Sequence, residues 1–552
     1  MKGEEIMRRK KVGILGMGGF LLLLSVELFG PESAQATHTK FTSPLKTASV
    51  LTTANITIDA IDANVQVLSG TPTLMWTLGG DFPPPTIRRP TGNTTNVTFN
   101  HKLTQILTEL GNGTRTGVPG LHTELSIHHH GSHVAPVNDG WACGFYFGPG
   151  HTNAGGSTKS TTNSRTYTYT LKENDAANST GNERGVTEWY HNHRVDVTGH
   201  TAWKGLAGGF FIIDDPADPQ TLPSGQFDVP LVIRDLQFDA NNQIPYRFVF
   251  EGTTGDHILV NGVPQPFFNV QPRKYMFRVL VPGNARKYFM RLVQEGSTTP
   301  IPMTQIGTDS GLMARPVNRT EIPVGIAERV VIVIDFKPFA GKNLILKNND
   351  AADGQCVPEG TCSAATADIM QFRVSSTPVT DDSVIPATLR ALPGTGTPVQ
   401  TRLFTFDEGT NWVINGKNMD CARTDADPVV NTREQWTLKN EGAWTHSIHM
   451  HDVDQICVSR NGAPCAEFER FKETWPMGPD VTFVVQLIPT DFTQAAGGST
   501  VDSIEAAGGR YMLHCHVLEH EDLAMMTQFR VKSVPDGVRR DTPCTPPGSC
   551  TQ

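Results

Sequence analysis

Short runs in which hydrophobic and polar residues alternate recur along the whole chain. Examples are "TANITIDAI", "RTYTYTL", "RKYMFRVLV", "ERVVIVIDF" and "VTFVVQLI", and turns rich in Gly, Pro and Asn separate them. Alternation with a period of two residues is typical of strands with one buried face, and long amphipathic helical stretches are scarce. The pattern therefore predicts an all-β protein built from antiparallel sandwiches or barrels.

Two connectors rich in proline or polar residues interrupt this pattern, "DDPADPQTLPSG" at 214–225 and "SSTPVTDDSVIPATLRALPGTGTP" at 375–398. Without its first 36 residues the chain has about 516 residues, which is too long for one hydrophobic core. The connectors divide it into three parts of comparable length. We therefore predict three domains, at residues 37–215, 216–378 and 379–552.

The N-terminus has the pattern of an export signal. "MKGEEIMRRKKVGILGMGGFLLLLSV" is basic and then apolar, and its apolar run Val12–Val26 is short for a bilayer span. "AQA" at 34–36 offers small residues to a signal peptidase. We expect a cleaved signal peptide at residues 1–36 and a periplasmic or extracellular protein; an uncleaved membrane anchor is the alternative. Arg8 and Arg9 leave open whether export follows the Sec or the twin-arginine route.

The charge balance excludes some classes of partner. The chain has a formal net charge of -9, with 46 basic and 55 acidic residues, and no basic block follows the N-terminal signal. This pattern does not favour nucleic-acid binding. No long apolar run follows the signal, so we expect no stable membrane insertion after its removal.

The nine cysteines are an odd number, and one of them stands between His514 and His516. The other eight could form four disulfides in an oxidising compartment. Three pairs are close in sequence and the fourth follows by elimination: Cys356 with Cys362, Cys457 with Cys465, Cys544 with Cys550, and Cys143 with Cys421. The sequence does not fix this connectivity.

Four His-x-His pairs form the strongest chemical signal. Chance placement of 18 histidines in 552 residues would give roughly 0.6 such pairs. In a strand, residues i and i+2 share a face about 6.5 to 7 Å apart, so each pair can offer imidazoles to neighbouring metal ions. We call these eight residues the cluster histidines: His128, His130, His191, His193, His449, His451, His514 and His516.

Strand parity separates a second group of ligands. Cys515 lies between two cluster histidines and must face the other way, as must His446, three residues before His449. Together with His520 and Met525 they supply two imidazoles, a thiolate and a weak axial thioether, the ligands of a blue copper electron-transfer centre. One strand would thus serve two metal sites, joined by a short covalent electron path.

These motifs resemble those of the multicopper oxidase family over nearly the whole chain after the signal. The family patterns H-x-H, H-x-H, H-x-x-H-x-H and H-C-H-x-x-x-H-x-x-x-x-M occur in order. The resemblance implies three cupredoxin-like Greek-key domains and four copper ions, with a trinuclear cluster between the first and third domains. Matched position by position, it implies type 1 ligands His446, Cys515, His520 and Met525, type 2 ligands His128 and His449, and type 3 ligands His130, His191, His193, His451, His514 and His516.

Within the family, the chain looks most like bacterial spore-coat laccases and bilirubin oxidases. The resemblance is carried by "HCHVLEHEDLAMM", "GLAGGFFIIDD", "VPLVIRDLQF" and "ILVNGVPQPFFNVQPRKYMFRVL". By this resemblance, Asp139 and Glu521 match acidic residues that assist proton delivery to the cluster. Ordinary surface or turn acids are the alternative for both.

The sequence departs from the family pattern in two places. His129 fills the middle of the first pair, where relatives usually have Trp or Leu, and "HMHD" replaces H-x-H-G. His129 and His133 are expected to be either stray surface metal binders or solvated histidines. Met450, Met525 and Met526 are better explained as ligand or packing residues than as the methionine-rich insert of a cuprous oxidase.

The resemblance implies a laccase-type oxidase, because four coppers store the four electrons that convert dioxygen to two waters. Electrons would enter singly at the surface-near type 1 copper, and His514–His516 would relay them inward. Phenols and aromatic amines are the first candidates for the donor, followed by bilirubin-like tetrapyrroles and Mn(II), with Cu(I) oxidation as a distinct alternative. A copper-binding protein without turnover would be favoured by the loss of a cluster ligand, and none is lost.

Overall fold

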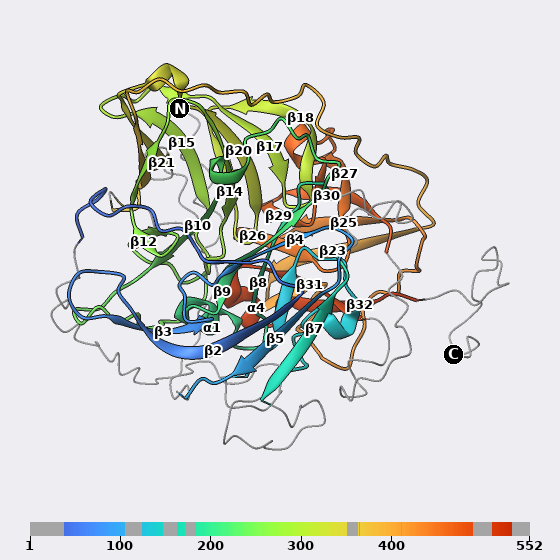
Figure 1. Cartoon of the computed structure of the whole chain (residues 1–552). Coiled ribbons are helices and arrows are strands. Elements are labelled where there is room, and N and C mark those ends of the chain that lie inside the picture. The colour runs from blue at the N-terminus through green and yellow to red at the C-terminus, as the bar shows by residue number, and fades with distance from the viewer. Residues whose placement is uncertain are drawn as a thin grey trace, which may run out of the picture.

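The computed structural model describes residues 38–104, 124–146, 163–171, 184–349, 363, 365–409, 411–489 and 510–532. Strands dominate these residues, and six sheets contain them (Figure 1). Helical segments are short: α1 (Thr198–Lys204), α4 (Leu518–Asp522) and the 3-10 turns Pro136–Asn138, Gly225–Phe227, Lys337–Phe339 and Glu467–Glu469. The predicted all-β class is confirmed.

Strands between residues 50 and 214 form two sheets, which we call the first sandwich. The five-stranded sheet has the order β1 (Val50–Leu51), β4 (Thr86–Pro90), β9 (Ala207–Asp214), β8 (Thr187–Asn192) and β6 (Ile127–His130). The four-stranded sheet has the order β3 (Thr73–Leu78), β2 (Asn55–Val65), β5 (Thr95–His101) and β7 (Ser164–Tyr169). Ile58 and Phe99 from one sheet pack with Tyr190 and Phe211 from the other in one buried core.

Strands between residues 228 and 374 form the middle sandwich. Its seven-stranded sheet has the order β12 (Val263–Pro264), β11 (His257–Val260), β10 (Asp228–Leu236), β14 (Lys274–Leu280), β20 (Arg329–Asp335), β17 (Met303–Thr308) and β18 (Gly311–Arg319). The facing sheet has the order β13 (Phe267–Val270), β22 (Asp368–Val374), β21 (Asn343–Asn348), β15 (Tyr288–Gln294) and β16 (Pro300–Ile301), with β19 (Ile322–Val324) paired to β15.

Strands between residues 400 and 530 form the third sandwich. One sheet has the order β24 (Trp412–Ile414), β23 (Gln400–Glu408), β25 (Glu434–Asn440), β30 (Thr482–Leu487), β27 (Gln455–Arg460) and β28 (Phe471–Lys472). The other has the order β29 (Thr474–Met477), β26 (His446–Met450), β31 (Arg510–Cys515) and β32 (Met526–Arg530). Its core includes Cys515 and Met525, so the second ligand group is embedded in hydrophobic packing.

The alternating runs in the sequence predicted strands correctly. They correspond to β2, β7, β14, β20 and β30. The connector at 375–398 contains no helix or strand, and the one at 214–225 lies between the end of β9 and a 3-10 turn. Each sandwich lies within one predicted domain, and the domain boundaries themselves stay predictions.

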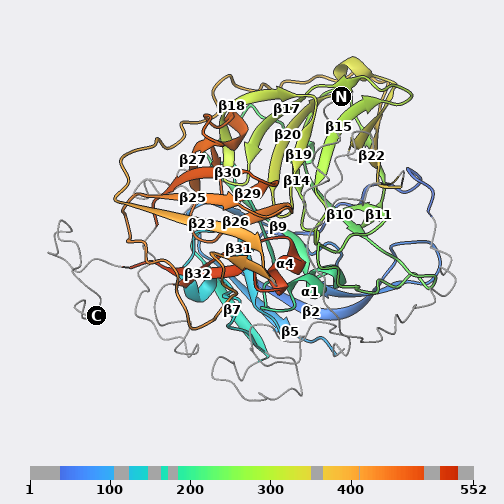
Figure 2. The same ribbon diagram turned by 180° about the vertical axis from the view of Figure 1, so that it is seen from behind.

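The first and third sandwiches are joined covalently. A disulfide connects Cys143 to Cys421, and a second one closes the loop from Cys457 to Cys465. These two predicted pairs are confirmed, whereas Cys356–Cys362, Cys544–Cys550 and the signal at 1–36 lie outside the described residues. Within the described ranges, no helix is long and apolar enough to cross a membrane. Seen from opposite sides, α1 and α4 lie side by side near the centre of the molecule (Figures 1 and 2).

Candidate metal centre

The structure brings the cluster histidines together from two sandwiches. In the first, β6 pairs with β8 so that His128 lies opposite His191, and in the third, β26 pairs with β31 so that His449 lies opposite His514. Across the interface, the rings of His130 and His449 stack with their centroids 3.6 Å apart. Local strand pairing and stacking between sandwiches therefore converge on one buried site.

Nitrogen atoms of the cluster histidines converge on possible metal positions. The Nε2 atom of His514 lies 3.2 Å from that of His193 and 3.3 Å from that of His451. The ring of His516 lies 5.1 Å from those of His130 and His191. Three groups have ligand atoms within 4.8 Å of one another: His193, His451 and His514; His128, His130 and His191; and His128, His449 and His451.

Hydrogen bonds orient these rings with one nitrogen toward the protein. His128 Nδ1 lies 2.5 Å from the carbonyl of Asp139, and His191 Nδ1 lies 3.0 Å from the carbonyl of Asn192. Among the described residues, no hydrogen-bond partner meets the buried Nε2 of either ring. A ring whose N–H is held by a protein acceptor presents its other nitrogen to a metal, so this is the arrangement of a metal ligand.

Asp139 and Glu521 each contact the outer side of cluster histidines. Asp139 Oδ2 accepts a hydrogen bond from His451 Nδ1 at 2.7 Å, and Glu521 Oε2 lies 3.1 Å from His514 Nδ1. Both carboxylates are buried, so neither is a surface acid. Burial alone would raise the pKa of Glu521, but the imidazoles of His514 and His193 outweigh it and lower the pKa to about 2.

The second ligand group faces away from the cluster, as strand parity predicted. The Nδ1 atoms of His446 and His520 lie 3.1 Å apart, and Cys515 Sγ lies 3.5 and 3.7 Å from them. The backbone of Met525 is hydrogen-bonded to two of these residues. Its N–H donates to the carbonyl of His520, and its carbonyl accepts from the N–H of Cys515. Burial raises the pKa of Cys515 to about 12, so the thiol must release its proton to bind a metal.

Burial also sets the protonation state of the imidazoles. Desolvation lowers the pKa of His193 and His446 to about 3, and it also lowers the pKa of His130 and His191 well below the usual value. These rings are therefore neutral near pH 7. Neutral imidazole is the form that binds transition metals.

Aromatic rings cover the second ligand group, a feature that the sequence did not reveal. Trp412, which begins β24, stacks on His520 with ring centroids 3.8 Å apart. Phe250 in turn stacks on Trp412 at 4.7 Å, and 38% of its surface is exposed. His520 is itself buried beneath Trp412, whereas part of Phe250 is exposed to solvent.

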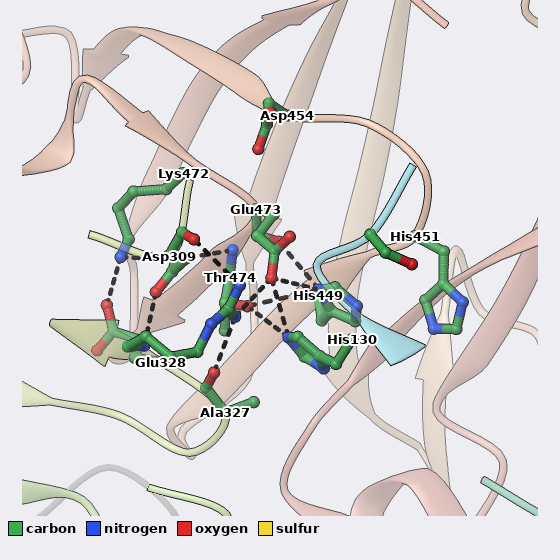
Figure 3. A network of polar contacts seen from close by, with 12 residues as sticks. His130, Asp309, Ala327, Glu328, His449, His451, Asp454, Lys472, Glu473 and Thr474 are labelled. Carbon is green, nitrogen blue, oxygen red and sulfur yellow. Dashed lines mark hydrogen bonds and ion pairs between the residues drawn. The ribbon is translucent and has the colours of Figure 1, made fainter. Parts of the chain in front are cut away.

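Glu473 is a second residue of the site that the sequence did not reveal. Its Oε1 lies 3.0 Å from His130 Nε2, and its backbone carbonyl lies 3.3 Å from His449 Nδ1 (Figure 3). Neither its spacing from the histidine motifs nor its residue type marks it in the sequence.

Both expectations for His129 and His133 are wrong, because the two side chains are buried. His129 lies between Phe211 and Tyr169, and its Nε2 contacts Glu188 at 2.6 Å. The middle residue of the His-x-His pair points into the core of the first sandwich, where a hydrophobic residue would otherwise pack. His133 Nε2 likewise lies 3.2 Å from Asp454.

The other departure from the family pattern concerns Asp452. Its φ of 69° is a left-handed conformation, which favours glycine and is tolerated by Asp. Met450 and Met526 are buried in hydrophobic clusters, in agreement with a packing role.

Comparison with known proteins identifies the family. Residues 395–535 match the family model of the multicopper oxidases. A bilirubin oxidase from Albifimbria verrucaria is 33% identical over 426 residues, which cover 74% of this chain and 68% of that protein. The chain belongs to the multicopper oxidase family. A laccase from Bacillus subtilis is also 32% identical over 375 residues, covering 62% of this chain and 70% of that protein.

Solved structures of multicopper oxidases share the fold. The enzyme from Pediococcus acidilactici has a TM-score of 0.72 at 23% identity, covering 93% of this chain and 95% of its own. McoA from Aquifex aeolicus has the same TM-score and identity, covering 90% and 100%. The predicted cupredoxin-like fold is thereby confirmed.

The ligand atoms fit the copper that this family implies. Buried neutral imidazoles, several with an unpaired nitrogen within the described part of the chain, suit copper, and a cysteine thiolate adds the soft ligand of a blue site. As a multicopper oxidase, the protein is a copper-dependent oxidoreductase that uses dioxygen as its acceptor.

Proposed function

We propose that this protein is a laccase-type oxidase that couples one-electron oxidation of phenols or aromatic amines to four-electron reduction of dioxygen to water. One observation carries the proposal. Strand β31 gives His514 to the cluster and Cys515 to the group with His446 and His520, so a single stretch of backbone links the two sites. This is what an enzyme needs when electrons enter at one site and dioxygen is reduced at another.

The proposed coppers number four. The type 1 copper would be held by His446, Cys515, His520 and Met525, and the type 2 copper by His128 and His449. The remaining cluster histidines hold the two type 3 ions: His130, His191, His193, His451, His514 and His516. Bound copper would supply reversible one-electron chemistry, and four ions together match the four electrons that dioxygen takes up.

The two buried carboxylates have proposed roles in proton delivery. Asp139 lies against His451 Nδ1 and Glu521 lies against His514 Nδ1, so each reaches the cluster from its outer side. With its lowered pKa, Glu521 is ionised near pH 7, so it would accept a proton transiently and pass it inward to the cluster. Water formation consumes four protons for each dioxygen, which such groups would have to provide.

The aromatic cover supports an aromatic donor. A flat ring can stack on exposed Phe250, and Phe250, Trp412 and His520 form a continuous series of stacked rings. Bilirubin-like tetrapyrroles could use the same surface. Mn(II) and Cu(I) remain alternatives on the same copper scaffold, and they would not depend on ring stacking.

We also propose that the protein works outside the cytoplasm, in the periplasm or extracellular space, with domains at 37–215, 216–378 and 379–552. The disulfides Cys143–Cys421 and Cys457–Cys465 support this location, because such bonds persist in oxidising compartments. Each proposed domain contains both sheets of one sandwich.

The test is Cys515→Ser, which removes the thiolate and changes little in volume. We expect a folded protein without the blue absorption band and without oxidase activity towards a substituted phenol. Met526→Leu, in a buried packing position on the adjacent strand, is the control and should keep both properties. Oxidase activity in Cys515→Ser would refute the assignment of electron entry.

A further inference from the structure

A network of buried charged residues lies where the three sandwiches meet, beside the cluster. In Figure 3, His130 and His449 lie on one side of Glu473 and Thr474, and Asp309, Glu328 and Lys472 lie on the other. His130 belongs to the first sandwich, Asp309 and Glu328 to the middle one, and Lys472 to the third. The proposed copper ligands include no residue of the middle sandwich, and this network is one of the connections between that sandwich and the site.

Glu473 determines which nitrogen of His130 faces the cluster. His130 Nε2 lies 3.0 Å from Glu473 Oε1 and 3.3 Å from Thr474 Oγ1, and the charge of the carboxylate favours the tautomer with the hydrogen on Nε2. His130 Nδ1 is buried and has no hydrogen-bond partner in the described ranges. Nδ1 is therefore the metal-binding atom, and the carboxylate fixes both the tautomer and the ring orientation.

The same short segment orients His449. Its Nδ1 lies 3.3 Å from the backbone carbonyl of Glu473 and 3.4 Å from Thr474 Oγ1. The Nε2 atom of His449, like His130 Nδ1, meets no partner among the described residues. Residues 473 and 474 thus hold one proposed type 2 ligand and one proposed type 3 ligand.

Arg329 of the middle sandwich holds Glu473 in place. Its Nη1 lies 2.5 Å from Glu473 Oε1, and both side chains are buried. The guanidinium also donates from Nε to the carbonyl of Thr187 at 2.9 Å and from Nη2 to that of Asp309 at 3.2 Å. A guanidinium with several fixed partners is a rigid support for a carboxylate.

Gly131 allows this close approach. Its φ is +96°, and a Cβ atom there would lie 2.6 Å from Arg329 Nη2 and 3.1 Å from Glu473 Oε2. A side chain at this position would displace Arg329. The lack of a side chain at Gly131 therefore lets the arginine reach Glu473.

A second set of ion pairs anchors the segment before Glu473. Lys472 Nζ lies 2.8 Å from Asp309 and 2.7 Å from Glu328. Asp309 also accepts the backbone N–H of Thr474 at 3.2 Å and that of Arg329 at 2.9 Å. Both neighbours of Glu473 are therefore tied to the middle sandwich, which limits movement of the carboxylate.

We propose that Arg329 and Glu473 form a positioning clamp through which the middle sandwich sets the orientation of His130 and His449 for copper binding at the trinuclear cluster. The inference rests on the ligand assignment proposed above. Arg329 and Glu473 are positioning residues, because they act on copper through the rings of the two histidines. The clamp gives the middle sandwich a role in the chemistry of a site to which it contributes no ligand.

The test compares copper retention in Glu473→Gln, Arg329→Met and wild type during dialysis against a copper chelator. In Glu473→Gln the amide group opposes the guanidinium with its own N–H donors, and in Arg329→Met the carboxylate loses its partner. We expect both variants to bind copper at the cluster about 10- to 100-fold more weakly. The type 2 electron paramagnetic resonance signal and the type 3 absorption should be lost first, while the blue type 1 band stays.

Two further variants separate the clamp from general destabilisation. Glu434→Gln removes a buried carboxylate whose partners, Arg402 and Trp436, lie outside the proposed clamp. This variant should retain copper as the wild-type protein does. Glu473→Asp keeps the charge with a shorter reach, so it should retain more cluster copper than Glu473→Gln. If a variant at 329 is not obtained folded, Arg329→Lys preserves the charge and should give an intermediate loss.

Two results would overturn the clamp. One is unchanged retention of type 2 and type 3 copper in both Glu473→Gln and Arg329→Met. The other is equal loss of type 1 and cluster copper, which would indicate a purely structural network. Because the readout requires no electron donor, failure of the wild-type protein to oxidise phenols would contradict the proposed donor without affecting this result.

Discussion

At the scale of single residues, the site depends on which nitrogen of each imidazole is already occupied. His128 and His191 donate to backbone carbonyls, His451 donates to Asp139, and His130 turns Nε2 toward the carboxylate of Glu473. Each acceptor leaves the opposite nitrogen for a metal. The ligands are thus organised before copper binds, which reduces the conformational cost of binding.

Glu521→Gln tests the role of the carboxylate at the cluster. The amide keeps the size of the side chain but cannot take up and release a proton, so we expect reoxidation of the reduced enzyme by dioxygen to slow by about 10- to 100-fold. Reduction by the donor should be unchanged. Anaerobic reduction followed by rapid mixing with dioxygen measures the two steps separately.

Glu519→Gln is the matched control for this experiment. Glu519 is buried on the same helix and bonds to Tyr246 and Asn284. Its substitution should leave reoxidation unaltered. Reoxidation of Glu521→Gln at the wild-type rate would contradict the proposed role in proton delivery.

At the scale of elements, alternation in the sequence predicted several of the strands and the faces of Cys515 and His446 relative to the cluster histidines. It placed the side chain of Cys515 on the other face of the strand from that of His514, and in β31 the two residues do belong to different ligand groups. Alternation does not reveal which strands meet, so the contact of Glu473 with His130 and the stack of Trp412 on His520 had no local signal. His129 was misjudged because a polar residue type hid a core-facing position.

Phe250→Ala tests whether the aromatic cover over β24 receives the donor. Because the ring is 38% exposed and stacks on Trp412, its loss should lower the free energy of unfolding by about 1 to 2 kcal/mol. We expect a higher KM for a substituted phenol and little change for a small inorganic donor, because stacking area is lost.

Val249→Ala provides the control, since Val249 is the neighbouring residue and is 41% exposed. It should leave the KM for the phenol unchanged. Equal KM values for Phe250→Ala and wild type would show that the phenol binds elsewhere.

At the scale of the whole molecule, the site lies between parts of the chain that are far apart in sequence. Cluster histidines come from the first and third sandwiches, and the disulfide Cys143–Cys421 joins these two. Arg329 of the middle sandwich forms an ion pair with Glu473 beside the cluster. Copper binding should therefore stabilise the association of the sandwiches as well as each local site.

Copper removal tests this coupling. A ligand that binds only the folded state at about 100 times its Kd adds about 2.7 kcal/mol to the free energy of unfolding. We expect the chelated protein to have a lower Tm by calorimetry and to recover on addition of copper. Identical transitions with and without copper would contradict the coupling.

The most direct test of the proposed oxidase activity is dioxygen uptake by the copper-loaded protein, with a substituted phenol, bilirubin, Mn(II) and Cu(I) compared as donors and peroxide assayed alongside. We expect rapid uptake with the phenol, one dioxygen consumed for every four electrons donated, and no peroxide. Uptake only with a metal ion would reassign the donor. Release of peroxide, or no uptake with any donor, would contradict a four-electron oxidase.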